Sequence, residues 1–274
     1  MRSFNFYYDD ADSLRAIGES PDVRSAAKNA QSTLVQIFAG RGTAAELVAL
    51  SRALHALWPG VCVLGATSAG EIRDGAVSTG RIVVAVSFFA HTRLSGALFE
   101  RGAISDDERA TDSDADAALG RRLAARLVGP DTRAIVLLGT GRDVDIGQVL
   151  TTLHGCCPDI PVAGGTAADN MQLQQTLVFD HGRACECGVV AVALHGSDLR
   201  VHRYWHLSWQ SIGKEMTVTK ANRSRLFELD HQPAMQVYRR YLGDDIEHNF
   251  YKRVLAFPLL ARRGDMWVAR VPFA

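Results

Sequence analysis

Two parts of the chain repeat the same order of apolar and polar positions. In each, an apolar run leads into a segment of helical periodicity, then into a short strand-like run, a glycine-rich turn and a long apolar run. The matching segments are 34–40 and 134–140, 54–71 and 153–170, and 80–88 and 187–194. The pattern predicts a unit of strand, helix, short strand, turn and long buried strand, present twice.

The central segments of the two repeats align without a gap. Between 54–71 and 153–170, leucine, histidine, proline, valine, glycine, threonine and alanine recur in register. Repetition of this kind indicates a duplicated structural unit. We therefore expect an α/β fold in which internally duplicated strand-helix-strand units, at about 30–100 and 130–198, form mixed sheets.

Both predicted helices begin with a capping signal. Thr43 followed by Glu46 fits a capping box, and Asp145 followed by Gln148 is a looser form of it. Between the repeats, the segment 104–128 starts acidic and ends in arginines, which suits a helix dipole and predicts a solvated connecting helix.

The pattern changes from residue 199, which predicts a smaller C-terminal α+β region over 199–274. Residues 201–209 alternate like a strand, and 216–219 with 226–229 predict a hairpin. Residues 233–242 predict a helix that Gly243 ends. The strand-like end of the chain lacks a closing turn, so we expect this region to be incomplete and to be followed by more protein.

Charge and composition exclude several classes of partner and location. Thirty basic and thirty acidic residues cancel, so we expect neither nucleic acid nor a membrane surface as a partner. The apolar runs are far shorter than the roughly 20 residues that span a bilayer, and the N-terminus does not resemble a signal peptide, so we expect a cytoplasmic protein. Five cysteines lack zinc-type spacing, and Cys185 and Cys187 are expected to pack and not to form a redox pair.

The two glycine-rich turns are the candidate ligand site, because turns at strand ends present backbone amides and hydroxyls to a ligand. The candidate residues are Gly65, Thr67, Ser68, Gly70 and Glu71 in the first turn and Gly164, Gly165, Thr166, Asp169 and Asn170 in the second. No lysine follows Gly70, which excludes a phosphate loop. Asp169 and Asn170 suit ligand recognition and turn formation equally well.

Residues 66–70 also approximate a nucleophile elbow centred on Ser68, and this leaves a serine hydrolase as an alternative. The matching residue of the second repeat is Ala167, so the turn persists without the hydroxyl. This favours an architectural turn and a protein that is not an enzyme; an enzyme would need Ser68 or Asp169 to be activated by a base.

Histidines near residue 204 are candidate metal ligands. On a strand, His202, Tyr204 and His206 would share one face, and either histidine could bind haem iron. No C-x-x-C-H motif is present, so such a haem would be non-covalent. The alternative is an ordinary hydrogen-bonded histidine.

The order and spacing of these segments resemble the FIST domains, sensory modules found beside signalling output domains. The resemblance is carried by 59–72, 164–170, 176–179 and 188–194, and, for the family's C-terminal part, by 212–213, 218–219, 226–230 and 233–243. It implies a FIST N-terminal region over 1–198 and a FIST C-terminal region over 199–274. Residues 221–224 depart from the glycine turn that the family pattern predicts.

The resemblance implies a small-molecule ligand, such as an amino acid, and coupling of ligand binding to a partner or fused output domain. A subset of the family is similar to haem-based nitric oxide sensors that regulate a histidine kinase or a cyclic-di-GMP enzyme. This gives a second hypothesis, in which the gas binds through haem held by His202 or His206.

Overall fold

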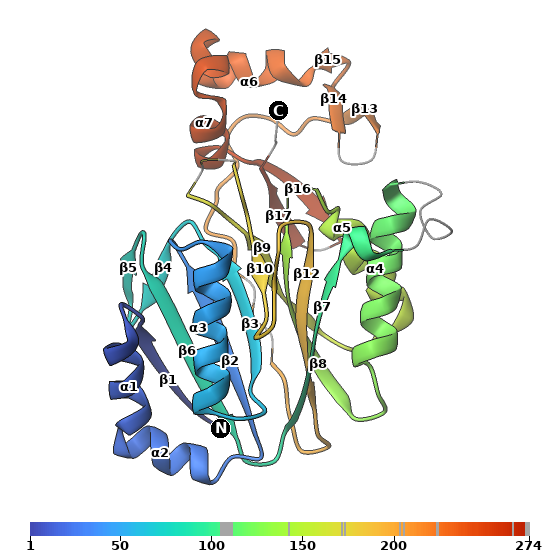
Figure 1. Cartoon of the computed structure of the whole chain (residues 1–274). Helices are drawn as coiled ribbons and strands as arrows, with labels where there is room; N and C mark the ends of the chain where they lie inside the picture. The colour runs from blue at the N-terminus through green and yellow to red at the C-terminus, as the bar shows by residue number, and fades with distance from the viewer. Residues whose placement is uncertain are drawn as a thin grey trace. The chain divides into compact units, whose positions relative to one another are not determined.

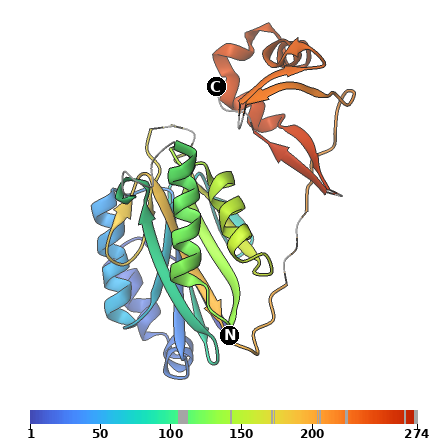
Figure 2. The same cartoon turned by 90° about the vertical axis from the view of Figure 1, so that its right-hand side faces the viewer.

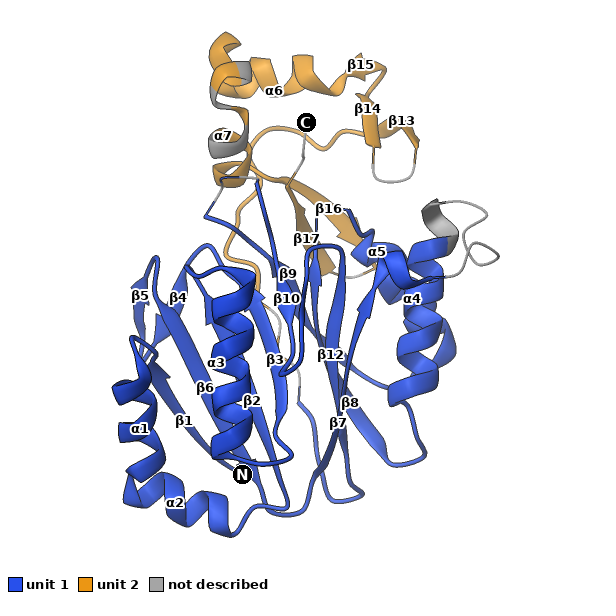
Figure 3. Cartoon of the chain, in the orientation of Figure 1, with its two compact units in different colours: residues 1–203 blue, residues 204–274 orange. Residues whose placement is uncertain are grey.

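The computed structural model describes residues 1–274 except 105–111, 142, 171, 173, 203, 205, 223–224, 265 and 272–274. Two compact units make up the chain, residues 1–203 and residues 204–274, coloured separately in Figure 3. The first unit contains both sequence repeats. The second contains the smaller C-terminal region.

The first repeat supplies most of a six-stranded mixed sheet. In spatial order its strands are β1 (Arg2–Tyr7), β6 (Ile82–Phe89), β2 (Ser32–Ala39), β3 (Cys62–Thr67), β10 (Val178–Phe179) and β11 (Ala184–Cys185). Strands β2 and β3 are parallel and are connected by helix α3 (Ala44–Leu57), whereas the other pairs are antiparallel. The last two strands come from the second repeat, which therefore contributes a segment to the sheet of the first.

The second repeat forms a four-stranded sheet with the same strand order. Its strands are β7 (Arg93–Glu100), β12 (Gly188–His195), β8 (Thr132–Thr140) and β9 (Val162–Ala167). Strands β8 and β9 are parallel and are connected by helix α5 (Ile146–Cys156). The order β7-β12-β8-β9 matches β1-β6-β2-β3. The structural repeats therefore start with β1 and β7, and each of these strands precedes the segments that align in sequence.

Three apolar clusters stack these elements into four layers (Figures 1 and 2). One cluster lies between the first sheet and helices α1 (Ala11–Glu19), α2 (Pro21–Lys28) and α3. Another lies between the second sheet and helices α4 (Asp112–Leu127) and α5. The third joins the inner faces of the two sheets. Unit 1 is therefore a helix-sheet-sheet-helix sandwich.

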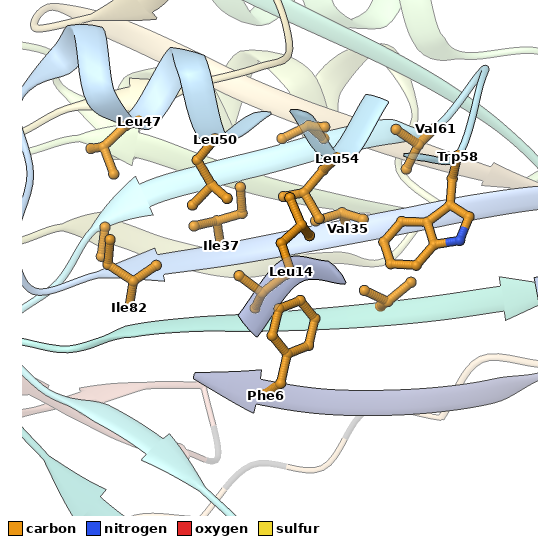
Figure 4. Close-up of a cluster of buried hydrophobic side chains, with 14 of the residues drawn as sticks. Phe6, Leu14, Val35, Ile37, Leu47, Leu50, Leu54, Trp58, Val61 and Ile82 are labelled. Carbon is orange, nitrogen blue, oxygen red and sulfur yellow. The ribbon is translucent and has the colours of Figure 1, made fainter. Parts of the chain in front are cut away.

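Helix α3 shows how the sequence builds this arrangement. Its capping box is present, with Thr43 and Glu46 each accepting from the other's backbone, and its apolar residues recur at helical spacing. Leu47, Leu50 and Leu54 thus lie on one face and pack against the outward side of β2 (Figure 4). Asp145 caps α5 in the same way, accepting from the Gln148 amide.

The predicted α/β class, both repeats, the caps and the buried strands are confirmed. Two element predictions are wrong. Helix α4 is not a solvated connector, because Leu119, Leu123 and Leu127 are fully buried against the second sheet. Residues 201–209 contain no strand in their described part, since no neighbouring strand pairs with them there and most of their side chains are exposed.

Unit 2 has a small core of its own. Its elements are β13 (Val218–Asn222), β14 (Arg225–Leu229), β15 (Gln232–Pro233), α6 (Ala234–Leu242), α7 (Phe250–Ala256), β16 (Leu259–Arg263) and β17 (Met266–Arg270). Tyr238, Ile246, Phe250 and Val254 form the buried cluster. The predicted hairpin is β13–β14, the predicted helix is α6, and Gly243 ends that helix with φ 94°.

Candidate functional site

The two glycine-rich turns meet at the carboxyl ends of β3 and β9. The amide of Ala168 donates to the carbonyl of Thr67 at 3.0 Å, which joins the turn of one repeat to that of the other. Thr67 is also tied to Leu177, because its amide donates to the Leu177 carbonyl and its Oγ1 accepts from the Leu177 amide, both at 3.0 Å. The structure therefore brings the two predicted turns together.

A buried carboxylate organises the first turn. Glu71 begins strand β4 (Glu71–Arg73), which forms a short hairpin with β5 (Ala76–Ser78), and is only 1% exposed. Ser68 Oγ donates to Glu71 Oε1 at 2.6 Å, and the amide of Arg81 donates to Oε2 at 3.0 Å. These bonds make Glu71 an internal anchor of the turn.

The same bonds bear on the serine hydrolase alternative. The Ser68 hydroxyl proton is used in the bond to Glu71, and none of the described hydrogen bonds of Ser68 involves an imidazole. Gly65 lies beneath the ring of Phe179 and is buried, so it serves packing. Thr67 and Ser68 are half-buried and Gly70 is exposed, which leaves these three as the reachable members of the first turn.

The second turn is more open. Gly164, Gly165 and Thr166 are exposed on β9, which is the edge strand of its sheet. Asp169 Oδ2 accepts from the amides of Gln174 at 2.6 Å and Gln175 at 3.2 Å, and Asn170 has a left-handed backbone with φ 55°. Both polar residues therefore have turn-forming roles.

Sequence reasoning did not show that a group of side chains gathers beside the first turn. The guanidinium of Arg81 lies 4.2 Å from the centre of the Tyr7 ring and that of Arg73 lies 4.8 Å from it. Arg81 also contacts both oxygens of Asp9 at 3.1 Å, and Arg41 lies 3.7 Å from the same carboxylate. Arg41 lies two residues after the end of β2 and three before the start of α3. Loops of this kind bind ligands in α/β proteins, so this signal could have been found in the sequence.

The two histidine candidates have different surroundings. His202 and His206 are both exposed and belong to different units. His206 lines a groove of about 440 Å³ in unit 2 together with Leu207, Trp209, Ser211, Leu260, Met266 and Trp267. Within the part of the chain that the structure describes, no three histidine, cysteine or acidic side chains are grouped as a metal site.

The described architecture is that of an internally duplicated α/β domain whose strand-end turns converge. The model of the FIST N domain matches residues 33–232, and the chain therefore belongs to the FIST family. FIST domains are sensory domains for small ligands in signalling proteins. Comparison with curated proteins gives no match. No helix in the described ranges is long and apolar enough to cross a membrane.

Proposed function

We propose that this chain is a cytoplasmic sensory domain that binds a small amino-acid-like ligand where its two glycine-rich turns meet. The observation that carries the proposal is the Ala168 to Thr67 hydrogen bond, which couples one repeat to the other at the carboxyl ends of two parallel strand pairs. Strand ends of this kind are the usual ligand site of open α/β sheets.

The reachable groups suit a ligand with a carboxylate. Thr67 Oγ1 already accepts from Leu177, and no hydrogen bond among the described residues uses its own proton, which can therefore donate to a ligand oxygen. Thr166 presents a second hydroxyl on the exposed edge strand, and Gly164 and Gly165 leave the backbone beside it uncovered. Arg41 follows Gly40, which packs against Glu71 of the first turn. Its guanidinium, which lies 3.7 Å from the carboxylate of Asp9, could turn to the ligand carboxylate.

Ligand binding at this junction would change how the two repeats are arranged relative to each other. A ligand that prefers one arrangement shifts the population toward it by its differential affinity, and a few kcal/mol moves an output substantially. We propose that the output is a fused or separate signalling protein, such as a histidine kinase or a cyclic-di-GMP enzyme.

A thermal-shift screen of the amino acids tests the proposal. We expect at least one to raise the melting temperature, and Thr67→Val and Thr166→Val to weaken its apparent affinity by about 10-fold each, as loss of one hydrogen bond predicts. Thr33→Val is the matched control, because Thr33 lies at the opposite end of β2. Binding that survives both turn substitutions would place the site elsewhere.

A second candidate function is haem-based sensing of nitric oxide. The groove at His206 favours it, since two tryptophans, a methionine, two leucines and a serine line that groove together with the His206 imidazole. His202 does not line this groove. His206 would supply the axial ligand and Trp209 and Trp267 would pack against the ring. Haem supplies the gas-binding iron when it is present.

Visible spectra of protein expressed with haem test this second candidate in the ferric, ferrous and nitric-oxide forms. We expect a Soret band that shifts with the gas and is lost in His206→Ala but kept in His202→Ala. A flat spectrum, or a band that depends on His202, contradicts the assignment.

A further inference from the structure

A serine, a histidine and an aspartate lie within interaction distance at the opposite end of the second sheet from the turns. Ser95 is on β7, His195 is the last residue of β12, and Asp131 directly precedes β8. Ser95 Oγ lies 2.7 Å from His195 Nε2. On the other side of the ring, Nδ1 lies 3.0 Å from Thr132 Oγ1 and 3.8 Å from Asp131 Oδ1.

Charge and burial set the protonation of this cluster. Burial lowers the pKa of His195, opposed by the nearby Asp131 carboxylate and aided by Arg93, so the imidazole is neutral at neutral pH. The hydrogen bond from Arg93, at 2.6 Å, lowers the pKa of Asp131 and keeps it ionised. Both oxygens on the Nδ1 side can accept, which favours the tautomer with its proton on Nδ1 and leaves Nε2 free to accept from Ser95.

We propose that Ser95 is a nucleophile for small uncharged carboxylic esters, with His195 as its general base. Asp131 and Thr132 act as positioning residues that hold the imidazole. Ser95 is half-buried on β7, an edge strand of the second sheet, so a small acyl group can approach it from the open edge. Pairing of Arg93 with Asp131 leaves no excess charge for an anionic substrate.

The reaction balances without a cofactor. Ser95 Oγ bonds to the carbonyl carbon while its proton moves to Nε2, the bond to the alkoxide breaks, and the alkoxide leaves as an alcohol with that proton. Water then attacks the acyl carbon and gives a proton to His195, the bond from Ser95 Oγ to that carbon breaks, and Oγ takes the proton back from Nε2 as the carboxylic acid leaves. Ser95 and the neutral imidazole are restored.

A purely structural role is the competing explanation, because His195 is 6% exposed beside the apolar cluster of the second sheet. The two roles differ in reactivity. A structural hydroxyl does not react with a fluorophosphonate, whereas a serine that the imidazole activates as a nucleophile does.

The experiment uses the full chain with a fluorophosphonate probe and p-nitrophenyl acetate. We expect one added probe mass on the intact protein, mapped to Ser95, and ester turnover that falls by about 100-fold or more in Ser95→Ala and His195→Gln. Ser87→Ala is the matched control, because Ser87 is also a strand serine but is bonded to Ser3 and not to a histidine.

The unmodified protein provides a test that does not depend on the variants folding. Its labelling rate is expected to rise with pH through the lowered pKa of His195, so that the midpoint of the rise lies below about pH 6.5, the ordinary value for histidine. Absence of labelling, labelling at another residue, or a rate that keeps rising toward pH 9 overturns the proposal.

Discussion

At the scale of single residues, aligned glycines of the two repeats are required for different steric reasons. A side chain at Gly65 would meet the ring of Phe179, whereas Gly165, one position beyond the counterpart of Gly65, faces open space. Gly164, the counterpart itself, has φ 148° and lies against the backbone carbonyl of Leu137. Glycine at these aligned positions is thus kept for packing in one repeat and for a close backbone approach in the other.

Alanine substitution tests this difference. Gly65→Ala is expected to lower the free energy of unfolding by about 1–3 kcal/mol, because a methyl group must displace a fully buried ring. Gly165→Ala should change it by less than about 1 kcal/mol. Urea unfolding followed by circular dichroism gives both values, and equal effects would contradict the packing argument.

The thiols give a second prediction at this scale. Burial raises the pKa of Cys185 to about 11 and raises the pKa values of Cys62, Cys157 and Cys187 as well, so these four stay protonated at neutral pH. Cys156 is exposed. We expect one fast reaction with a maleimide at pH 7, at Cys156, and slow reaction of the other four until the protein is unfolded. Fast labelling of Cys185 and Cys187 would instead support a redox pair.

His195 links stability to pH. Because its pKa is lowered in the folded state, the unfolded chain binds more protons below about pH 6.5, and stability is lost as the pH falls from there toward the folded value. The melting temperature should therefore drop between pH 7 and pH 5, above the range in which the carboxylates titrate. His195→Gln should have a smaller drop over the same interval. An unchanged slope in that variant would assign the effect to other groups.

At the scale of elements, local sequence signals determine where helices begin, whereas tertiary packing determines which strands pair. The cap of α3 was predictable because a capping box depends on residues that are close in sequence. Thr43→Ala should cost about 0.5–2 kcal/mol of stability, and Thr43→Ser, which keeps the oxygen, only a small part of that. Thermal unfolding of the two variants measures the difference; equal losses would mean that the methyl group and not the hydrogen bond matters.

The failures of sequence reasoning have a common cause, which is that the outcome depends on contacts with segments distant in the sequence. The sequence did not show that β1 and β7 occupy equivalent positions, because the two strands do not share residues. They are equivalent because β1 pairs with β6 as β7 pairs with β12. Residues 201–209 alternate like a strand but have no described partner edge. In the candidate site, the two turns were found by repetition, whereas Tyr7 beside Arg73 and Arg81 could not be, since these residues meet only through the fold.

At the scale of the whole molecule, unit 1 has the features of an independent folding unit. All three clusters of its sandwich lie within residues 1–203, and β10 and β11 of the second repeat complete the sheet of the first. Because β10 pairs with β3, the first repeat alone would leave the edge of β3 uncovered. The first repeat therefore depends on the second. Unit 2 has only a small separate cluster.

This division predicts where a protease cuts first. Between β12 and β13 the described residues form no helix or strand, and they include the exposed Arg200 and Lys214. Limited trypsin digestion should therefore cleave in this segment before it cleaves within the sandwich, leaving a resistant fragment that begins at Met1. A recombinant chain of residues 1–203 should likewise unfold cooperatively. An early cut inside residues 1–195 would contradict the predicted order of cleavage. A non-cooperative transition of the shortened chain would show that the sandwich depends on unit 2 for its stability.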